Sequence, residues 1–100
     1  MNERRAAGGM REALARIDHA LVQLALESPE IEAAVESLRE AEAWAERFGS
    51  RSTRARALLG LAHAARLRGA ATSNEAREAA ALFDSLGMAR YAQRARGLGA

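Results

Sequence analysis

The feature that most constrains this chain is a pair of apolar stripes, separated by a glycine, within residues 54–86. In each stretch the leucines and alanines recur every three or four residues, which places them on one face of a helix. Gly69 separates the stretches, and glycine readily adopts the left-handed backbone that ends a helix. Thr72 precedes Glu75 by three residues, the spacing of a capping box that opens the next helix. These signals predict an antiparallel helical hairpin.

Composition favours an all-α fold with a thin core. Apolar residues make up 49% of the 100 residues, but 26 residues are alanine, whose burial removes little area from water. The single proline and the scarcity of β-branched runs disfavour strands. The absence of cysteine excludes disulfides and thiolate metal sites. We therefore expect one domain, with a partner chain or a parent array covering part of its remaining apolar surface.

Targeting signals are not found in the sequence. No apolar run approaches the roughly 20 residues of a membrane span, and the first residues lack the apolar segment of a signal peptide. We expect a cytoplasmic protein without membrane association. All 15 basic residues are arginine and the net charge is only +2. Codon supply in a GC-rich genome explains this arginine usage better than selection for phosphate recognition does.

The apolar periodicity predicts five helices after a flexible leader. The leader covers residues 1–9, and a single domain covers residues 10–100. The boundaries follow from Ser28 and Pro29 at a helix start, from Gly49 at a helix end, and from a serine cap before the third helix. The predicted helices span about residues 10–27, 30–48, 53–68, 73–86 and 88–97.

The hairpin is partly repeated along the chain. A shift of 44 residues aligns the stretch around His19 with the stretch around His63, and a shift of 40 aligns Arg54-Ala55-Arg56 with Arg94-Ala95-Arg96. The helices therefore alternate as A, B, A, B and a final A-like helix, with a unit of about 40 residues.

This pattern resembles tetratricopeptide-type repeats. The A helices carry leucine pairs followed by small residues, and the B helices begin with Glu-Ala and end with Leu-Phe-x-x-Leu-Gly. It is most similar to the longer, degenerate repeats of bacterial LuxR-type and maltose-regulator-type transcription activators, whose arrays often end in segments similar to ALFDSLGMARYAQRARGLGA. The resemblance covers about residues 10–100 and implies a right-handed stack of antiparallel helical hairpins. Short loops also allow a closed up-and-down helical bundle.

The chain departs from the repeat pattern at Asp18, where a small residue is expected, and in the long loop of residues 69–73. It contains no helix-turn-helix and no nucleotide-binding segment, so the resemblance implies neither DNA binding nor ATP hydrolysis.

Catalysis has little support. The only histidines, His19 and His63, occupy matching repeat positions. Asp18 cannot orient the His19 imidazole, because adjacent helical residues point in different directions. A two-histidine metal site would lack both a third ligand and the one-face spacing of a zinc motif. We predict no catalytic residue, no metal, no cofactor and no enzyme activity.

Charges are strongly segregated along the sequence. Residues 27–46 contain seven glutamates and one arginine, and residues 47–74 contain six arginines and no acidic residue. In one interpretation, the second and third helices pack side by side and neutralise each other on solvated faces. In the other, the stripe formed by Arg56, Leu59, His63 and Arg66 binds a ligand.

The resemblance places that stripe in a groove, because the corresponding face of tetratricopeptide A helices binds partner segments. Arginines at its edges would suit an acidic or C-terminal peptide, since guanidinium groups bind carboxylates bidentately. Trp44 lies off the main apolar stripe and is predicted to form an interface or to pack locally. The predicted partner-binding residues are Glu12, His19, Arg56, Leu59, His63, Arg66 and Arg96.

The sequence thus predicts a non-catalytic protein–protein interaction module, an adaptor or regulatory domain that binds a partner helix or an acidic peptide. Self-association as a homodimer through alanine-rich faces is a second mode, because a short solenoid leaves its ends uncovered. The alternative is a fragment of a small-molecule-sensing or DNA-associated transcriptional regulator. Binding of nucleic acid is disfavoured, because the chain has few aromatic residues and its basic segment lies beside an acidic one.

Overall fold

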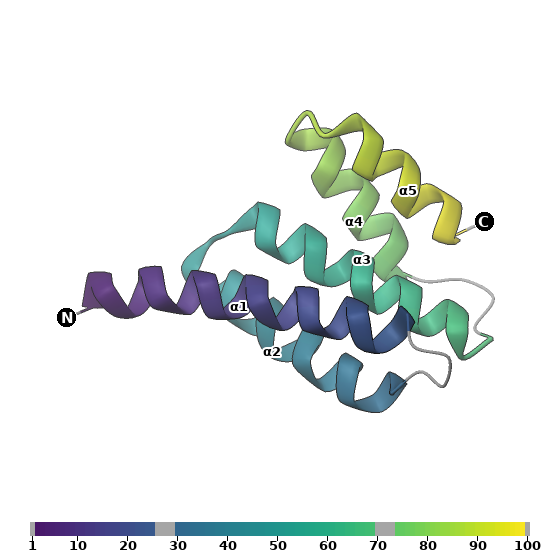
Figure 1. Cartoon of the computed structure of the whole chain (residues 1–100). Helices are drawn as coiled ribbons and strands as arrows, with labels where there is room; N and C mark the ends of the chain where they lie inside the picture. The colour runs from purple at the N-terminus through teal and green to yellow at the C-terminus, as the bar shows by residue number, and fades with distance from the viewer. Residues whose placement is uncertain (1, 26–29, 70–73, 100) are drawn as a thin grey trace.

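The chain is all-α, as predicted, and no strand occurs in the part that the structure describes. The computed structural model describes residues 2–25, 30–69 and 74–99. The helices, shown in Figure 1, are α1 (Asn2–Ala25), α2 (Ile31–Phe48), α3 (Arg51–Leu67), α4 (Asn74–Ser85) and α5 (Ala89–Gly99).

The start of α1 differs most from the predicted boundaries. The helix begins at Asn2, within the stretch that we assigned to a leader at residues 1–9. The residues after Asn2 include glutamate, arginine and alanine, which are good helix formers. The cost of the pair Gly8 and Gly9, about 1 kcal/mol for each residue, does not end the helix at that point.

Glycine ends the helices where predicted. Gly49 has φ of 70° and its N–H donates to the carbonyl of Ala45, which ends α2 in the left-handed conformation. Gly69 and Gly87 also have positive φ, of 82° and 73°. The predicted start signals at Ser28, Pro29 and Thr72 lie outside the described residues.

A serine precedes α3, as predicted. Ser50 occupies the N-cap position, and its hydroxyl donates to Thr53 Oγ1 at 2.8 Å instead of accepting a backbone N–H. Thr53 is almost fully buried, so the pair of hydroxyls satisfies a polar group within the core.

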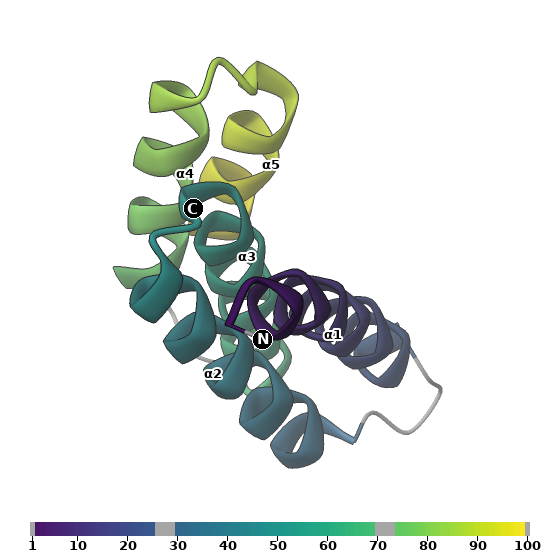
Figure 2. The same ribbon diagram turned by 90° about the vertical axis from the view of Figure 1, so that its left-hand side faces the viewer.

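The five helices form an open stack. Each helix contacts the next along the chain, and α3 also contacts α1 and α5. Figure 2 shows α3 between the α1–α2 hairpin and the α4–α5 hairpin. Among the helical residues described, α1 contacts neither α4 nor α5, whereas a closed bundle brings its first and fourth helices together.

The stack has two layers. Helices α1, α3 and α5 form one layer, and α2 and α4 form the other (Figures 1 and 2). The smallest principal extent is 18 Å, close to the combined width of two packed helices of about 10 Å each. The side of α3 that faces away from α2 and α4 therefore lies between α1 and α5.

The helices pack closely because the residues between them are small. Of the 21 buried hydrophobic residues among those described, 14 are alanine. Phe83, Leu38 and Leu58 are the largest fully buried apolar side chains. Helices α2 and α3 approach closely at Gly60 of α3, where a Cβ atom would lie 2.7 Å from Leu38 Cδ2 of α2.

No described helix combines the length and the apolar character needed to cross a bilayer.

The approach of α2 to α3 predicts the effect of Gly60→Ala. The added methyl group would overlap the Leu38 side chain, which is fully buried and has little room to move. We expect a net loss of about 1–3 kcal/mol in the free energy of unfolding, measured by urea denaturation.

Gly97→Ala in α5 is the matched control, because a Cβ atom there meets nothing within 4 Å. This change should leave stability equal or raise it by up to about 1 kcal/mol, since alanine favours a helix over glycine. If Gly60→Ala is as stable as wild type, the contact is looser than the structure has it.

Candidate functional site

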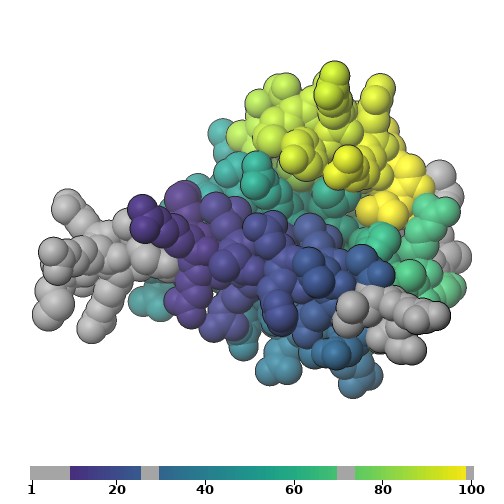
Figure 3. Space-filling view, viewed as in Figure 1, coloured from purple at the N-terminus to yellow at the C-terminus, as the bar shows by residue number. Residues whose placement is uncertain are grey.

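The candidate site is the surface between α1 and α5, which we call the inner groove. Its floor is the stripe of α3 formed by Arg56, Leu59, His63 and Arg66. Figure 3 shows atoms of α3 between the α1 and α5 surfaces. Arg56 and Arg66 are exposed and His63 is half-buried, whereas Leu59 is only 9% exposed. The α3 stripe therefore offers its charged ends and part of His63, whereas Leu59 belongs mainly to the core.

Tyr91 forms the α5 side of the inner groove. Its ring stacks on Phe83, with centroids 5.1 Å apart and planes at 24°, so one face of the ring is covered from the core. The guanidinium carbons of Arg56 and Arg94 lie 5.8 and 5.6 Å from the Tyr91 centroid. Cation–π attraction holds both guanidiniums beside one aromatic ring.

Arg66 extends from α3 to the end of α5. Its Nη1 donates to the carbonyl of Gly97 at 2.9 Å, which ties the two helices together at this end of the groove. Neither Arg66 nor Arg56 forms an ion pair with any carboxylate of the described residues. Positive charge is therefore held at two places along the groove without local neutralisation.

The α1 side of the inner groove is apolar. Arg16 and Gln23 of α1 bond to Glu40 and Glu30, which places their side of the helix toward α2. Leu14 and Leu21 lie on the other flank of the buried α1 stripe, next to α3. Leu21 is 39% exposed, so it offers apolar surface opposite the arginines.

Arg96 lies outside the inner groove, contrary to expectation. Its guanidinium pairs with the carboxylate of Asp84 in α4, which places this side chain on the edge of α5 that faces α4. Arg94, two residues earlier, occupies the groove edge instead. The shift of 40 residues aligns Arg56 with Arg96, whereas the structure brings Arg94 and Arg56 to the same Tyr91 ring.

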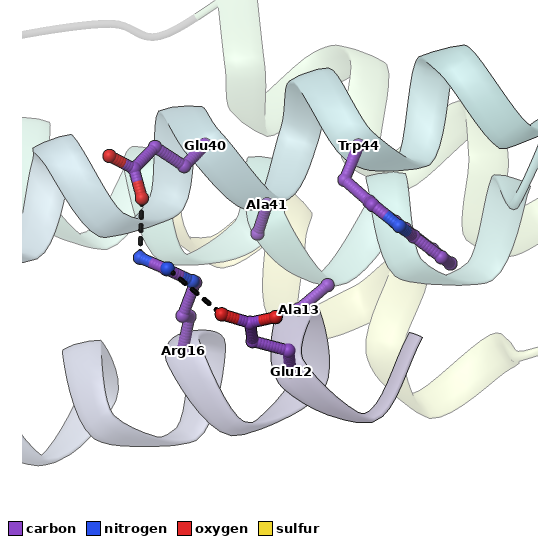
Figure 4. Close-up of a pocket in the computed structure, with 6 residues that line it drawn as sticks. All are labelled: Glu12, Ala13, Arg16, Glu40, Ala41 and Trp44. Atoms are coloured by element: carbon purple, nitrogen blue, oxygen red, sulfur yellow. Dashed lines mark hydrogen bonds and ion pairs between the residues drawn. The ribbon is translucent and has the colours of Figure 1, made fainter. Parts of the chain in front are cut away.

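Glu12 and His19 also lie outside the inner groove. Arg16 pairs with Glu12 at 3.1 Å and with Glu40 of α2, as Figure 4 shows. Glu12, Arg16 and His19 recur every four and three residues, so they share the flank of α1 that faces α2. His19 is exposed there and His63 is half-buried in the groove, so the two histidines belong to different surfaces.

Trp44 lines a small pocket between α1 and α2, next to the ion pairs of Arg16 (Figure 4). The floor contains Ala13 and Ala41, which are too small to fill the space between the helices. No residue of α3 lines this pocket, so it opens on the side of the hairpin away from α3. Trp44 also contacts Phe48, with ring centroids 5.1 Å apart, so local packing accounts for part of its burial.

Neutralisation between α2 and α3 is weaker than one interpretation of the sequence proposed. The described residues give one such pair, Arg68 with Glu32 at 3.9 Å, which is long and exposed. Arg54 pairs instead with Glu78 of α4 at 3.0 Å. Most of the described glutamates of residues 27–46 and arginines of residues 47–74 are therefore not paired with each other.

The side chains of the inner groove are suited to binding. No group of three or more histidine or acidic side chains that could hold a metal ion occurs among the described residues. Within the inner groove, the described side chains offer guanidinium groups, one half-buried imidazole and apolar surface. These groups can bind carboxylates and apolar side chains.

Two residues of the inner groove, Tyr91 and Arg94, were missed in the sequence analysis. The contact of Arg56 with Tyr91 depends on how α5 is turned against α3. The i, i+3 spacing of Tyr91 and Arg94 was the available signal, because residues three apart are neighbours on a helix.

Comparisons of this chain with protein-family models, with curated proteins and with solved structures found no match.

The different surroundings of the two histidines predict different reactivity. Diethylpyrocarbonate should modify His19 several-fold faster than His63, because His19 is exposed and His63 is half-buried. Peptide mass spectrometry over a time course measures both rates in the same sample. The rates should converge in urea, and equal rates in the folded protein would contradict the placement of His63.

Proposed function

We propose that this chain is a non-catalytic, tetratricopeptide-like interaction module that binds a carboxylate-bearing segment of a partner protein in the inner groove. The observation that carries the proposal is the pair Arg56 and Arg66, which face this groove without an ion-pair partner among the described residues. We place the module in the cytoplasm of a bacterium, in line with the absence of cysteine and the arginine-only basic composition.

The two sides of the groove define the kind of segment that fits. The α3–α5 side offers Arg56, Arg66 and Arg94 to carboxylates, and the α1 side offers Leu14 and Leu21 to apolar side chains. An amphipathic helix with glutamates along one edge and leucines along the other matches both sides at once. Uncompensated guanidiniums favour this class of partner, since a charge-assisted hydrogen bond contributes about 1.5–3 kcal/mol.

The open stack of the five helices also supports a tetratricopeptide-like role. The stripe of α3 between α1 and α5 keeps Arg56 and Arg66 exposed and His63 half-buried, and it corresponds to the surface that A helices present to partners in tetratricopeptide arrays. A segment bound there would contact three helices of the stack. Affinity would then depend on surface residues and not on a reaction centre.

The proposal is tested with a synthetic peptide. A fluorescein-labelled helix of about 15 residues, with glutamates on one edge and leucines on the other, is titrated with the protein and followed by fluorescence polarisation. We expect Arg56→Glu/Arg66→Glu to weaken binding about tenfold to hundredfold, with helicity unchanged by circular dichroism.

Two controls separate the inner groove from net charge. Arg51→Glu/Arg77→Glu makes the same charge change outside the groove and should leave the affinity within about twofold. A peptide with glutamine in place of glutamate should bind weakly to wild type. Equal losses in both double variants, or equal binding of both peptides, would overturn the proposal. Tighter binding to a short DNA duplex, lost steeply with salt, would favour nucleic acid instead.

A further inference from the structure

The outer edge of α2 carries two exposed carboxylates, Glu32 and Glu36, that the fold compensates only weakly. Helix α2 contains five glutamates and two arginines. Glu32 and Glu36 lie four residues apart on one exposed stripe, away from the buried stripe of the helix. Glu40 continues this stripe but is paired with Arg16 of α1. Glu32 reaches only Arg68, at 3.9 Å, with 96% of its side chain exposed. Glu36 forms no ion pair among the described residues.

The opposite charge gathers in the inner groove and on α5. Helix α5 contains three arginines and no acidic residue. Of these, Arg96 is paired with Asp84, whereas Arg90 and Arg94 form no ion pair with a described carboxylate. Together with Arg56 and Arg66, these two arginines form a basic edge along the groove.

The acidic and basic edges cannot meet within one molecule. Arg56 and Arg66 lie on the side of α3 that faces away from α2. Figure 2 shows α3 between α2 and α5, and no contact joins α2 with α5 among the described residues. The edges can therefore compensate each other only between copies of the chain.

The acidic edge also fits the inner groove in length and in bulk. Glu32 and Glu36 are four residues apart, or about 6 Å along a helix, so both fit between Arg56 and Arg66, which are ten residues or about 15 Å apart. Ala33 and Ala43 are exposed beside the glutamates, so the outer side of α2 has few bulky side chains to hold it away from a neighbour.

We infer that the acidic edge of α2 in a second copy of this chain docks into the inner groove. The inference rests on the proposed function, because the second copy supplies the carboxylate-bearing segment. The contact joins two different surfaces, so it leaves a free acidic edge and a free groove at the ends of each pair. Such a heterologous contact propagates head to tail unless its rotation closes a ring.

The test is a charge swap followed by sedimentation velocity at low ionic strength. The wild type should sediment faster as its concentration rises from about 5 to 500 μM, a range that brackets modest affinities. Glu32→Arg/Glu36→Arg and Arg56→Glu/Arg66→Glu should each remain monomeric alone. An equimolar mixture of the two variants should associate again, because each acidic edge then faces a basic one.

Added salt and a control variant check the electrostatic origin of the contact. Salt of about 0.5 M should abolish the association, since it screens exposed charges over a few ångströms. Glu46→Arg/Glu78→Arg makes the same charge change as Glu32→Arg/Glu36→Arg away from the docking edge, and it should associate like wild type. Circular dichroism confirms that each variant is folded.

The outcomes distinguish this inference from the proposed function. A wild type that stays monomeric at 500 μM, or a variant mixture that stays monomeric, overturns the docking of a second copy. If Glu32→Arg/Glu36→Arg still binds the synthetic acidic peptide, the inner groove works as proposed whether or not copies associate. Loss of peptide binding in that variant would show that the peptide site is not confined to the groove.

Discussion

The close approach of α3 to its neighbours is the constraint on which the rest of the structure depends. Alanine fills most of the buried positions, and Gly60 lets the backbone of α3 come against Leu38 of α2. Side chains this small gain stabilisation only when the helices nearly touch, because dispersion forces fall off steeply with separation. The short distance between helices keeps the long side chains at the edges, where the arginines and glutamates lie.

Most of the fold could be predicted from the sequence because two local signals agree. Apolar spacing of three and four residues locates the helices, and glycines such as Gly49 and Gly69 mark their ends through a backbone conformation that other residues resist. Four helices begin and end within about two residues of their expected boundaries. The start of α1 was missed, because the glycine pair weakens a helix without stopping it and periodicity carries no information on how far fraying extends.

The candidate site was predicted less well, for a geometric reason. The stripe of Arg56, Leu59 and His63 was located because the apolar residues of α3 define which face is exposed. Repeat matching then transferred the same positions to α1, where the corresponding flank faces α2. Aligning two repeats shows which residues of each helix lie beside its buried stripe. It does not show which neighbouring helix those residues face. Contacts such as Arg56 of α3 with Tyr91 of α5 also depend on how helices distant in sequence are turned.

The central position of α3 has a consequence for how the molecule loses its structure. Repeat stacks commonly unravel from their ends, because each unit contacts only the units beside it. Here α3 contacts each of the other four helices, so removing it from the assembly deprives every one of them of a neighbour. Melting should therefore be a single cooperative event, seen at the same temperature by backbone and by tertiary probes.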